Sequence, residues 1–116
     1  MKKFLAIYLG GSDMRSQWDA LPEAEKQARM EKGMKAWHAW IETNKASLVD
    51  MGTPLGKTKK ISSKGIGDTK NLMTAYTVVQ AETHEAAAAL FTNHPHFAIF
   101  PGDSIEVMEC LPVPGM

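Results

Sequence analysis

Three histidines are the side chains of this sequence whose chemistry best suits proton transfer. His38 lies at the edge of an apolar stripe on a predicted helix, whereas His94 and His96 flank Pro95. A histidine gains and loses its proton near neutral pH, so His38 is a candidate general acid or base. We expect His38 and His94 to be catalytic, facing each other across a cleft, and His96 to bind the substrate.

Each of these histidines also has a second interpretation. A histidine beside an apolar stripe is often a half-buried structural residue, and a histidine near a helix C-terminus is favoured there by the helix dipole. Two histidines at a spacing of two, with a third elsewhere, could also bind a metal ion. No carboxylate or thiol is evidently placed to complete that set, so we expect no metal and no other cofactor. A metal-binding protein that uses His38, His94 and His96 remains a further alternative.

Two other residues are candidate substrate contacts. Asp50 follows the first predicted helix and could orient a histidine, as carboxylates do in acid–base pairs. Its alternative is an exposed aspartate of a turn. Trp40 lies on the same helix as His38 and supplies aromatic area for a pocket or a subunit contact. We expect both residues to contribute to substrate binding.

A long helix over residues 22–44 must position His38. Pro22 suits the start of a helix, and the acidic residues Glu23 and Glu25 are favoured in its first turn. One apolar stripe follows the helical spacing i, i+4, i+7 and i+11, formed by Met30, Met34, Trp37 and Ile41. This stripe is the face that we expect to lie against the rest of the molecule.

The remaining pattern predicts the order β-α-β-β-α-β. A polar loop is expected at 12–20, a turn at 65–68, and a second helix at 84–91, capped by Thr83. Asn93 to Pro95 ends that helix, because a residue before proline avoids the helical conformation. The strands are expected at 3–9, 55–62, 72–81 and 104–111. The second of these is rich in lysine and belongs at a sheet edge, where lysines discourage pairing with other chains.

These elements predict an α+β, ferredoxin-like sandwich with a four-stranded antiparallel sheet. Right-handed crossovers place both helices on one face of it. Strands 3–9 and 72–81 are nevertheless apolar on both sides, which is typical of strands covered on both faces. A large apolar face left open on a monomer indicates an interface. We therefore expect a homodimer packed sheet to sheet.

The bulk composition fits one small globular domain over residues 1–116. Hydrophobic residues make up 44% of the chain and charged residues 22%. Thirteen basic and thirteen acidic residues cancel, so the basic excess of nucleic-acid-binding proteins is missing and no nucleic-acid partner is expected. No stretch approaches the roughly 20 apolar residues of a membrane span. The one cysteine, Cys110, cannot form an internal disulfide, which favours a cytoplasmic location.

Four segments, spread over nearly the whole chain, carry a family resemblance: 36–40 (AWHAW), 50–55 (DMGTPL), 68–76 (DTKNLMTAY) and 94–97 (HPHF) with the following 102–112. They resemble DGPF-type proteins of the YCII-related family. The resemblance implies a ferredoxin-like subunit that dimerises into an α/β barrel. In YCII-like members a histidine of the first helix and an aspartate before the last strand are proposed as a catalytic pair. The histidine carries over to His38, but His94 stands where the family has the aspartate.

The sequence thus predicts a cytoplasmic, dimeric, YCII-like protein that acts on or binds a small molecule. Barrels of this kind leave a cavity between sheet and helices that can hold one small ligand. The first hypothesis is an enzyme that uses histidine acid/base chemistry in a cleft near His38. The alternative is a non-catalytic dimeric module that binds a small ligand, in which the histidines are scattered or bonded to the backbone.

Overall fold

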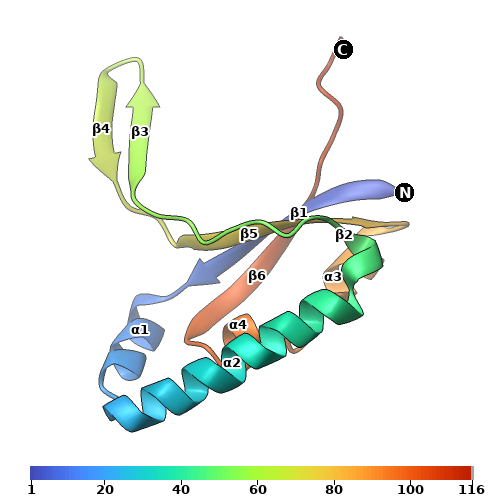
Figure 1. The fold of residues 1–116 in the computed structure, drawn as a ribbon. Helices are drawn as coiled ribbons and strands as arrows, with labels where there is room; N and C mark the ends of the chain where they lie inside the picture. Colours follow the sequence, from blue (N-terminus) through green and yellow to red (C-terminus); the bar gives the residue numbers. More distant parts are fainter. Residues whose placement is uncertain (116) are drawn as a thin grey trace.

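An antiparallel sheet forms the centre of the molecule (Figure 1). The computed structural model describes residues 1–115, and for residues 12–15 it leaves the side chains out. Within that part of the chain, four strands form the sheet in the order β2-β5-β1-β6, namely β2 (Leu48–Asp50), β5 (Met73–Ala81), β1 (Lys2–Gly10) and β6 (Gly102–Glu109). The α+β, ferredoxin-like arrangement predicted from the sequence is confirmed.

The central strand β1 divides the two faces of the sheet by simple alternation. Phe4, Ala6 and Tyr8 are buried on the helix-facing side, whereas Leu5 and Ile7 point to the other side. The neighbours in register continue both faces, because Phe4 pairs with Val79 and Leu5 with Val78. The centre of the face opposite the helices is therefore apolar, as expected, although Glu106 lies opposite Ile7 on it.

All helices lie on one side of the sheet (Figure 1). They are α1 (Ser12–Asp19), α2 (Glu23–Thr43), α3 (His84–Ala89) and α4 (Pro95–Ala98), with a short 3-10 turn at η1 (Lys45–Ser47). The hydroxyl of Thr83 caps α3 by accepting from the N–H of Ala86 at 3.0 Å, as predicted. Of the described helices, none is long and apolar enough to cross a membrane.

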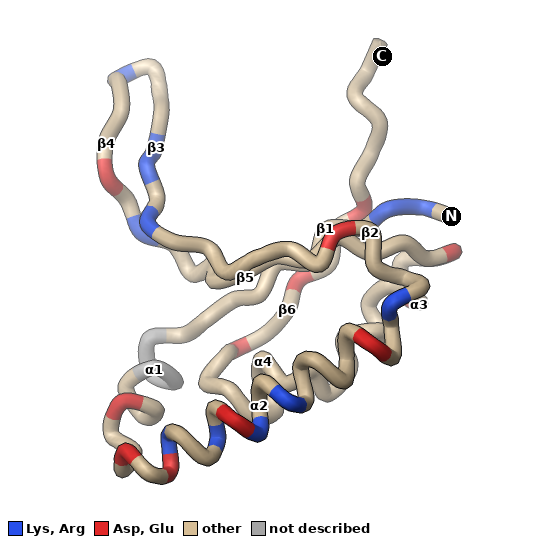
Figure 2. The backbone as a smooth tube through the Cα atoms, in the orientation of Figure 1, with Lys and Arg blue, Asp and Glu red and all other residues tan. Residues whose placement is uncertain are grey.

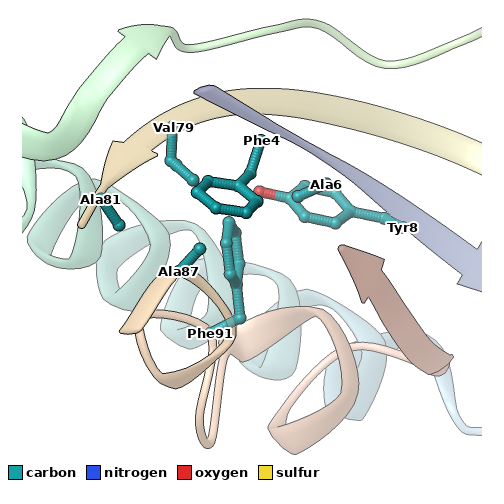
Figure 3. Close-up of a cluster of buried hydrophobic side chains, with 7 residues drawn as sticks. All are labelled: Phe4, Ala6, Tyr8, Val79, Ala81, Ala87 and Phe91. Carbon is teal, nitrogen blue, oxygen red and sulfur yellow. The ribbon is translucent and has the colours of Figure 1, made fainter. Parts of the chain in front are cut away.

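The main core lies between β1, β5 and α3. Figure 3 shows its side chains meeting from the sheet above and the helix below: Phe4, Ala6, Tyr8, Val79, Ala81, Ala87 and Phe91. Alanines at the sheet and helix surfaces leave room for the aromatic rings between them. This cluster fixes the position of β1 beside β5. Tyr8, the last member of the buried row on β1, also lines the site described below.

The predicted second strand is misplaced in the sequence interpretation. The strand that joins the sheet is β2, paired with β5 through Leu48 opposite Val79. Proline and glycine at 52–56 interrupt the extended chain, because Pro54 cannot donate to a strand ladder. Residues 58–62 instead form β3 (Thr58–Ser62), which pairs with β4 (Gly65–Thr69) as a separate hairpin. The expected turn at 65–68 is therefore strand, and the chain reverses at residues 63–64.

Two short helices were not predicted. The expected polar loop at 12–20 contains α1, whose Trp18 is buried with its ring centroid 6.3 Å from that of Phe100. The helix α4 follows His94 directly, because Pro95 at its first position is pre-set for a helical turn. Both helices bring side chains to the end of the layer where the site lies.

The β3–β4 hairpin and the C-terminal segment extend from the sheet on the side away from the helices (Figure 1). The radius of gyration is 16.2 Å and the extents are 54 × 43 × 18 Å. A compact domain of this length has a radius of gyration of about 13 Å. The excess reflects the two projecting segments.

Candidate functional site

A pocket of about 510 Å³ opens between α2 and the helix-facing side of the sheet. Its lining comes from β1, α1, α2, the 51–54 loop, β5 and the segment around α4: Tyr8, Trp18, Met30, Met34, Trp37, His38, Ile41, Met51, Gly52, Thr53, Pro54, Thr74, Ala75, Tyr76, His96, Phe100 and Pro101. Small-molecule sites typically have volumes of about 300–1,000 Å³. The pocket thus has room for one small ligand.

The wall of this pocket is mainly aromatic and sulfur-containing. Among the described residues that line it, there is no lysine, arginine, aspartate or glutamate. The described part of the wall thus offers mainly apolar surface, with the imidazoles of His38 and His96 as polar groups on it.

His38 lies on the pocket wall. It projects from α2 and is exposed, and within the described part of the chain no hydrogen bond involves its imidazole. Met34 and Ile41, one turn away on either side, line the same wall. Its ring is therefore available to a molecule that enters the pocket.

His96 also lines the pocket, and its ring is held by the backbone. Its Nε2–H donates to the carbonyl oxygen of Leu9 at 2.8 Å. Burial lowers the pKa of His96, opposed by hydrogen bonds to the carbonyls of Leu9 and Ser104 and by the charge of Asp103. A Cβ on Gly102 would overlap the ring, so this glycine makes room for it. His96 also borders a neighbouring hollow of about 480 Å³.

His94 does not reach the pocket, so the expectation that it faces His38 across the cleft is wrong. It is 0% exposed, and its Nδ1 accepts the N–H of His96 at 3.0 Å. The rings of Trp37 and Trp40 stand edge-on to it, with centroids 4.6 and 4.7 Å away. Its Nε2 has no hydrogen-bond partner among the described residues. The physical reason is its role as N-cap of α4, which turns the imidazole inward.

The environment of His94 disfavours its charged form. Burial, and secondarily the proximity of His96, lowers the pKa of His94 to about 4. At neutral pH it is an uncharged ring between two indoles. Its position is that of a packing and capping residue.

Tyr8 is the site residue that the sequence interpretation missed. Its hydroxyl lies 2.6 Å from the hydroxyl of Thr77, and Thr77 donates to the carbonyl oxygen of Met51 at 3.1 Å. Burial raises the pKa of Tyr8 to about 12, with the Thr77 hydrogen bond acting in the opposite direction. Its phenol therefore stays neutral. The one signal for it was a polar atom on the otherwise apolar, core-facing side of the first strand.

Asp50 and Trp40 lie outside the pocket lining. The carboxylate of Asp50 accepts the N–H of Gly52 at 2.8 Å and the hydroxyl of Tyr76 at 3.3 Å, and its charge raises the pKa of Tyr76. It thus anchors the turn after β2, which was its alternative interpretation. The indole N–H of Trp40 donates to the carbonyl of Leu90 at 2.8 Å, so Trp40 ties α2 to α3.

The three-histidine metal site is not formed. His38 and His96 both line the pocket, whereas the ring of His94 caps α4 and does not line the pocket. Across the described residues, no three His, Cys, Asp or Glu side chains come together in a group that could hold a metal ion. The described residues therefore do not form the arrangement that the metal-binding alternative requires.

Comparison with known proteins supports the fold. No known protein family matches the sequence, and no curated protein matches it. Among solved structures, the chain is similar to the 5-chloro-2-hydroxyhydroquinone dehydrochlorinase of Burkholderia phenoliruptrix in complex with 2,5-dihydroxybenzoquinone. The similarity covers 92% of this chain and 90% of the other, with a TM-score of 0.50 and 16% identity. At that identity the likeness shows a shared fold, and membership of the YCII-related family stays a prediction.

Proposed function

We propose that this chain is a small-molecule enzyme that holds one largely apolar ligand in the pocket beneath α2, with His38 as its proton-transfer residue. The observation that carries the proposal is a pocket of about 510 Å³ with an aromatic wall and a solvent-exposed imidazole on it. Apolar walls with a few placed polar groups are typical of small-molecule sites.

The neighbouring polar groups support this role for His38. Burial lowers the pKa of His96 and raises the pKa of Tyr8, so both are uncharged at neutral pH. His38 is exposed on the pocket wall, and among the described residues no hydrogen bond holds its imidazole, so it can contact a bound ligand directly. In this proposal, His96 and Tyr8 shape the floor and leave the proton transfer to His38.

The structural neighbour supports the size of ligand. The protein of similar fold is named for its action on 5-chloro-2-hydroxyhydroquinone and was solved with 2,5-dihydroxybenzoquinone, both built on one six-membered ring. A ring of that size fits the volume of this pocket and can pack on its aromatic wall, which includes Trp37 and Phe100. We therefore propose a planar, hydroxylated ring as the ligand class to test first.

Binding of hydroquinone, followed by quenching of tryptophan fluorescence, tests the site. Trp18 and Trp37 line the pocket and report on it. We expect His38→Gln to weaken binding by roughly three- to tenfold, the cost of one hydrogen bond. Lys35→Gln, an exposed change on the same helix outside the pocket, should leave binding unchanged. Equal affinity of the wild type and His38→Gln would remove His38 from the site, and tighter binding of benzoate than of hydroquinone would contradict an uncharged ligand.

A non-catalytic binding module is the second candidate. It predicts histidines bonded to the backbone, and that is the state of His84, His94 and His96. Release of chloride from 5-chloro-2-hydroxyhydroquinone separates the two candidates. An enzyme for this ring class should release chloride and lose the activity in His38→Gln, whereas a binding module should return the compound unchanged.

We further propose that the chain forms a homodimer through the open face of its sheet. That face carries Leu5, Ile7, Tyr76, Val78 and Met108, and no described segment of the chain packs over it (Figure 1). Apolar patches of this kind mark protein interfaces. The exposed, disulfide-free Cys110 also fits the cytoplasmic location predicted from the sequence.

A further inference from the structure

We propose that the β3–β4 hairpin is an arm that docks its isoleucine tip on a second copy of the chain. The inference rests on the proposed homodimer and goes beyond sheet-to-sheet packing. The hairpin forms a two-stranded sheet of its own, not hydrogen-bonded to the four-stranded sheet. It stands away from the body of the subunit (Figure 1).

The tip of the hairpin exposes two large apolar side chains. Ile61 and Ile66 are paired across the strands and are 73% and 75% exposed. A cross-strand pair of β-branched residues packs side by side on one face of a hairpin. On a monomer that face meets water, whereas on a partner it would be buried.

The two faces of the hairpin differ in character. Side chains two residues apart share a face, so Lys59 and Asp68 lie on the same face as the isoleucine pair. They form an ion pair at 2.5 Å, which neutralises both charges beside the apolar tip. The opposite face carries Lys60 opposite Gly67, with no apolar side chain. Only the isoleucine face is suited to docking.

An arm of this kind needs a partner to be stable. An isolated two-stranded hairpin is at best marginally stable in water. The contacts of this hairpin with the rest of its subunit are peripheral, such as the amide of Asn71 donating to the hydroxyl of Thr58 at 3.3 Å. Contact with a surface outside its own subunit would therefore stabilise the paired strands of the hairpin.

Charge and position point to a second copy as that surface. Residues 57–70 carry five lysines and one aspartate, a net charge of +4, so with a total of +0 the rest of the chain carries −4 (Figure 2). The arm of one subunit is thus attracted to the body of another. It extends on the same side as the open face of the sheet, so a copy seated there would meet it (Figure 1). In a two-fold dimer each arm would reach the other subunit.

Sedimentation equilibrium of the wild type and of the double variant I61S/I66S tests the arm. We expect a wild-type dimer and at least a tenfold higher dimer Kd in the variant. T69S removes one methyl group from the opposite face of the same hairpin and leaves the charge of the arm unchanged, so it should change the Kd less than threefold. Because both isoleucines are exposed in the subunit, thermal unfolding of the diluted variant should match that of the diluted wild type.

Hydrogen exchange on the wild type gives a readout that needs no variant. Amides of residues 58–69 should exchange more slowly above the dimer Kd than below it. A wild-type dimer whose Kd is unchanged in I61S/I66S, or whose hairpin amides exchange equally at both concentrations, overturns the arm and leaves the dimer standing. A wild type that is monomeric at all concentrations overturns both the dimer and the arm.

Discussion

The layer between the helices and the sheet has two ends that are built differently. At the packed end, near α3, the rings of Phe4 and Phe91 are sealed against Val79 and Ala87. At the open end, beneath α2, apolar side chains surround the pocket instead of closing it, and Met30 and Met34 remain 47% and 43% exposed. The same apolar composition thus produces a core at one end and a cavity at the other.

Side-chain size at the helix surface explains much of this difference. The run of alanines in α3 allows its backbone to approach the sheet closely, so the aromatic rings fill the remaining space. In α2 the single buried residue among those described is Gly33, against which the ring of Phe100 lies. In the α2 stripe, Trp37 packs on Tyr8 of β1 with ring centroids 5.3 Å apart, whereas Met30 and Met34 remain exposed beside the pocket. An apolar stripe at helical spacing therefore predicts which side faces inward, but not whether the space beneath it is filled.

The largest loss of stability is expected for a substitution at the packed end. Phe91→Ala should lower the free energy of unfolding by about 3–5 kcal/mol, because it opens a cavity among rings that cannot collapse freely. Met34→Ala, at the open end, should cost less than about 1 kcal/mol, because much of that side chain is already in water. Urea unfolding measures both. Similar losses for the two variants would mean that the ends are equally packed.

Lowering the pH should destabilise the folded protein through His94, which lies between the packed end and the open end. Its pKa is about 4 in the folded state and about 6.5 when unfolded, so the unfolded state binds the proton first. The contribution of the uncharged His94 ring to the free energy of unfolding is present above pH 6.5 and is lost as the pH falls towards 4. We expect about 2–3 kcal/mol of stability to be lost between pH 7.5 and pH 4.5 from this residue.

Variants isolate that contribution. His94→Asn keeps an acceptor for the N–H of His96 but cannot titrate, so its stability should vary less with pH than that of the wild type. His84→Gln, at an exposed histidine, should follow the wild-type profile. Parallel profiles for the wild type and His94→Asn would show that His94 is not kept neutral by its surroundings.

A smaller loss of stability is expected for a substitution at the open end, at Gly102. Gly102→Ala should cost about 1–3 kcal/mol and weaken hydroquinone binding, because a Cβ there overlaps the ring and carbonyl oxygen of His96. Gly56→Ala meets nothing within 4 Å and should change stability by no more than about 0.5 kcal/mol. Unfolding and binding are measured on the same samples. If Gly102→Ala binds hydroquinone as tightly as the wild type does, the ring of His96 does not contribute to the binding site.

Most of the fold was predictable because it depends on local pattern. The alternation of β1 and β5 and the cap at Thr83 act within a few residues and were identified correctly. The second strand was not, because pairing of β2 with β5 depends on contacts between residues 30 apart. The lysine-rich segment has strand propensity in either place, and only tertiary contacts decide that it leaves the sheet.

The site was predictable for residues whose direction follows from one element. The position of His38 on the α2 stripe placed it on the pocket wall. His94 and His96 could not be separated from sequence, because Pro95 starts a new helix between them and sends one ring to the cap and the other to the pocket. Asp50 and Trp40 have hydrogen-bond partners elsewhere that no spacing predicts.

The hydrogen bonds from Tyr8 to Thr77 and on to Met51 have a fixed direction. The hydroxyl of Thr77 has one hydrogen and gives it to the carbonyl of Met51, so the phenol of Tyr8 must be the donor to Thr77. The phenol thus has no hydrogen left for another partner. The two bonds run from β1 through β5 to the loop after β2, which supplies Met51 to the pocket wall. Two hydroxyl hydrogens thereby tie one wall of the pocket to the centre of the sheet.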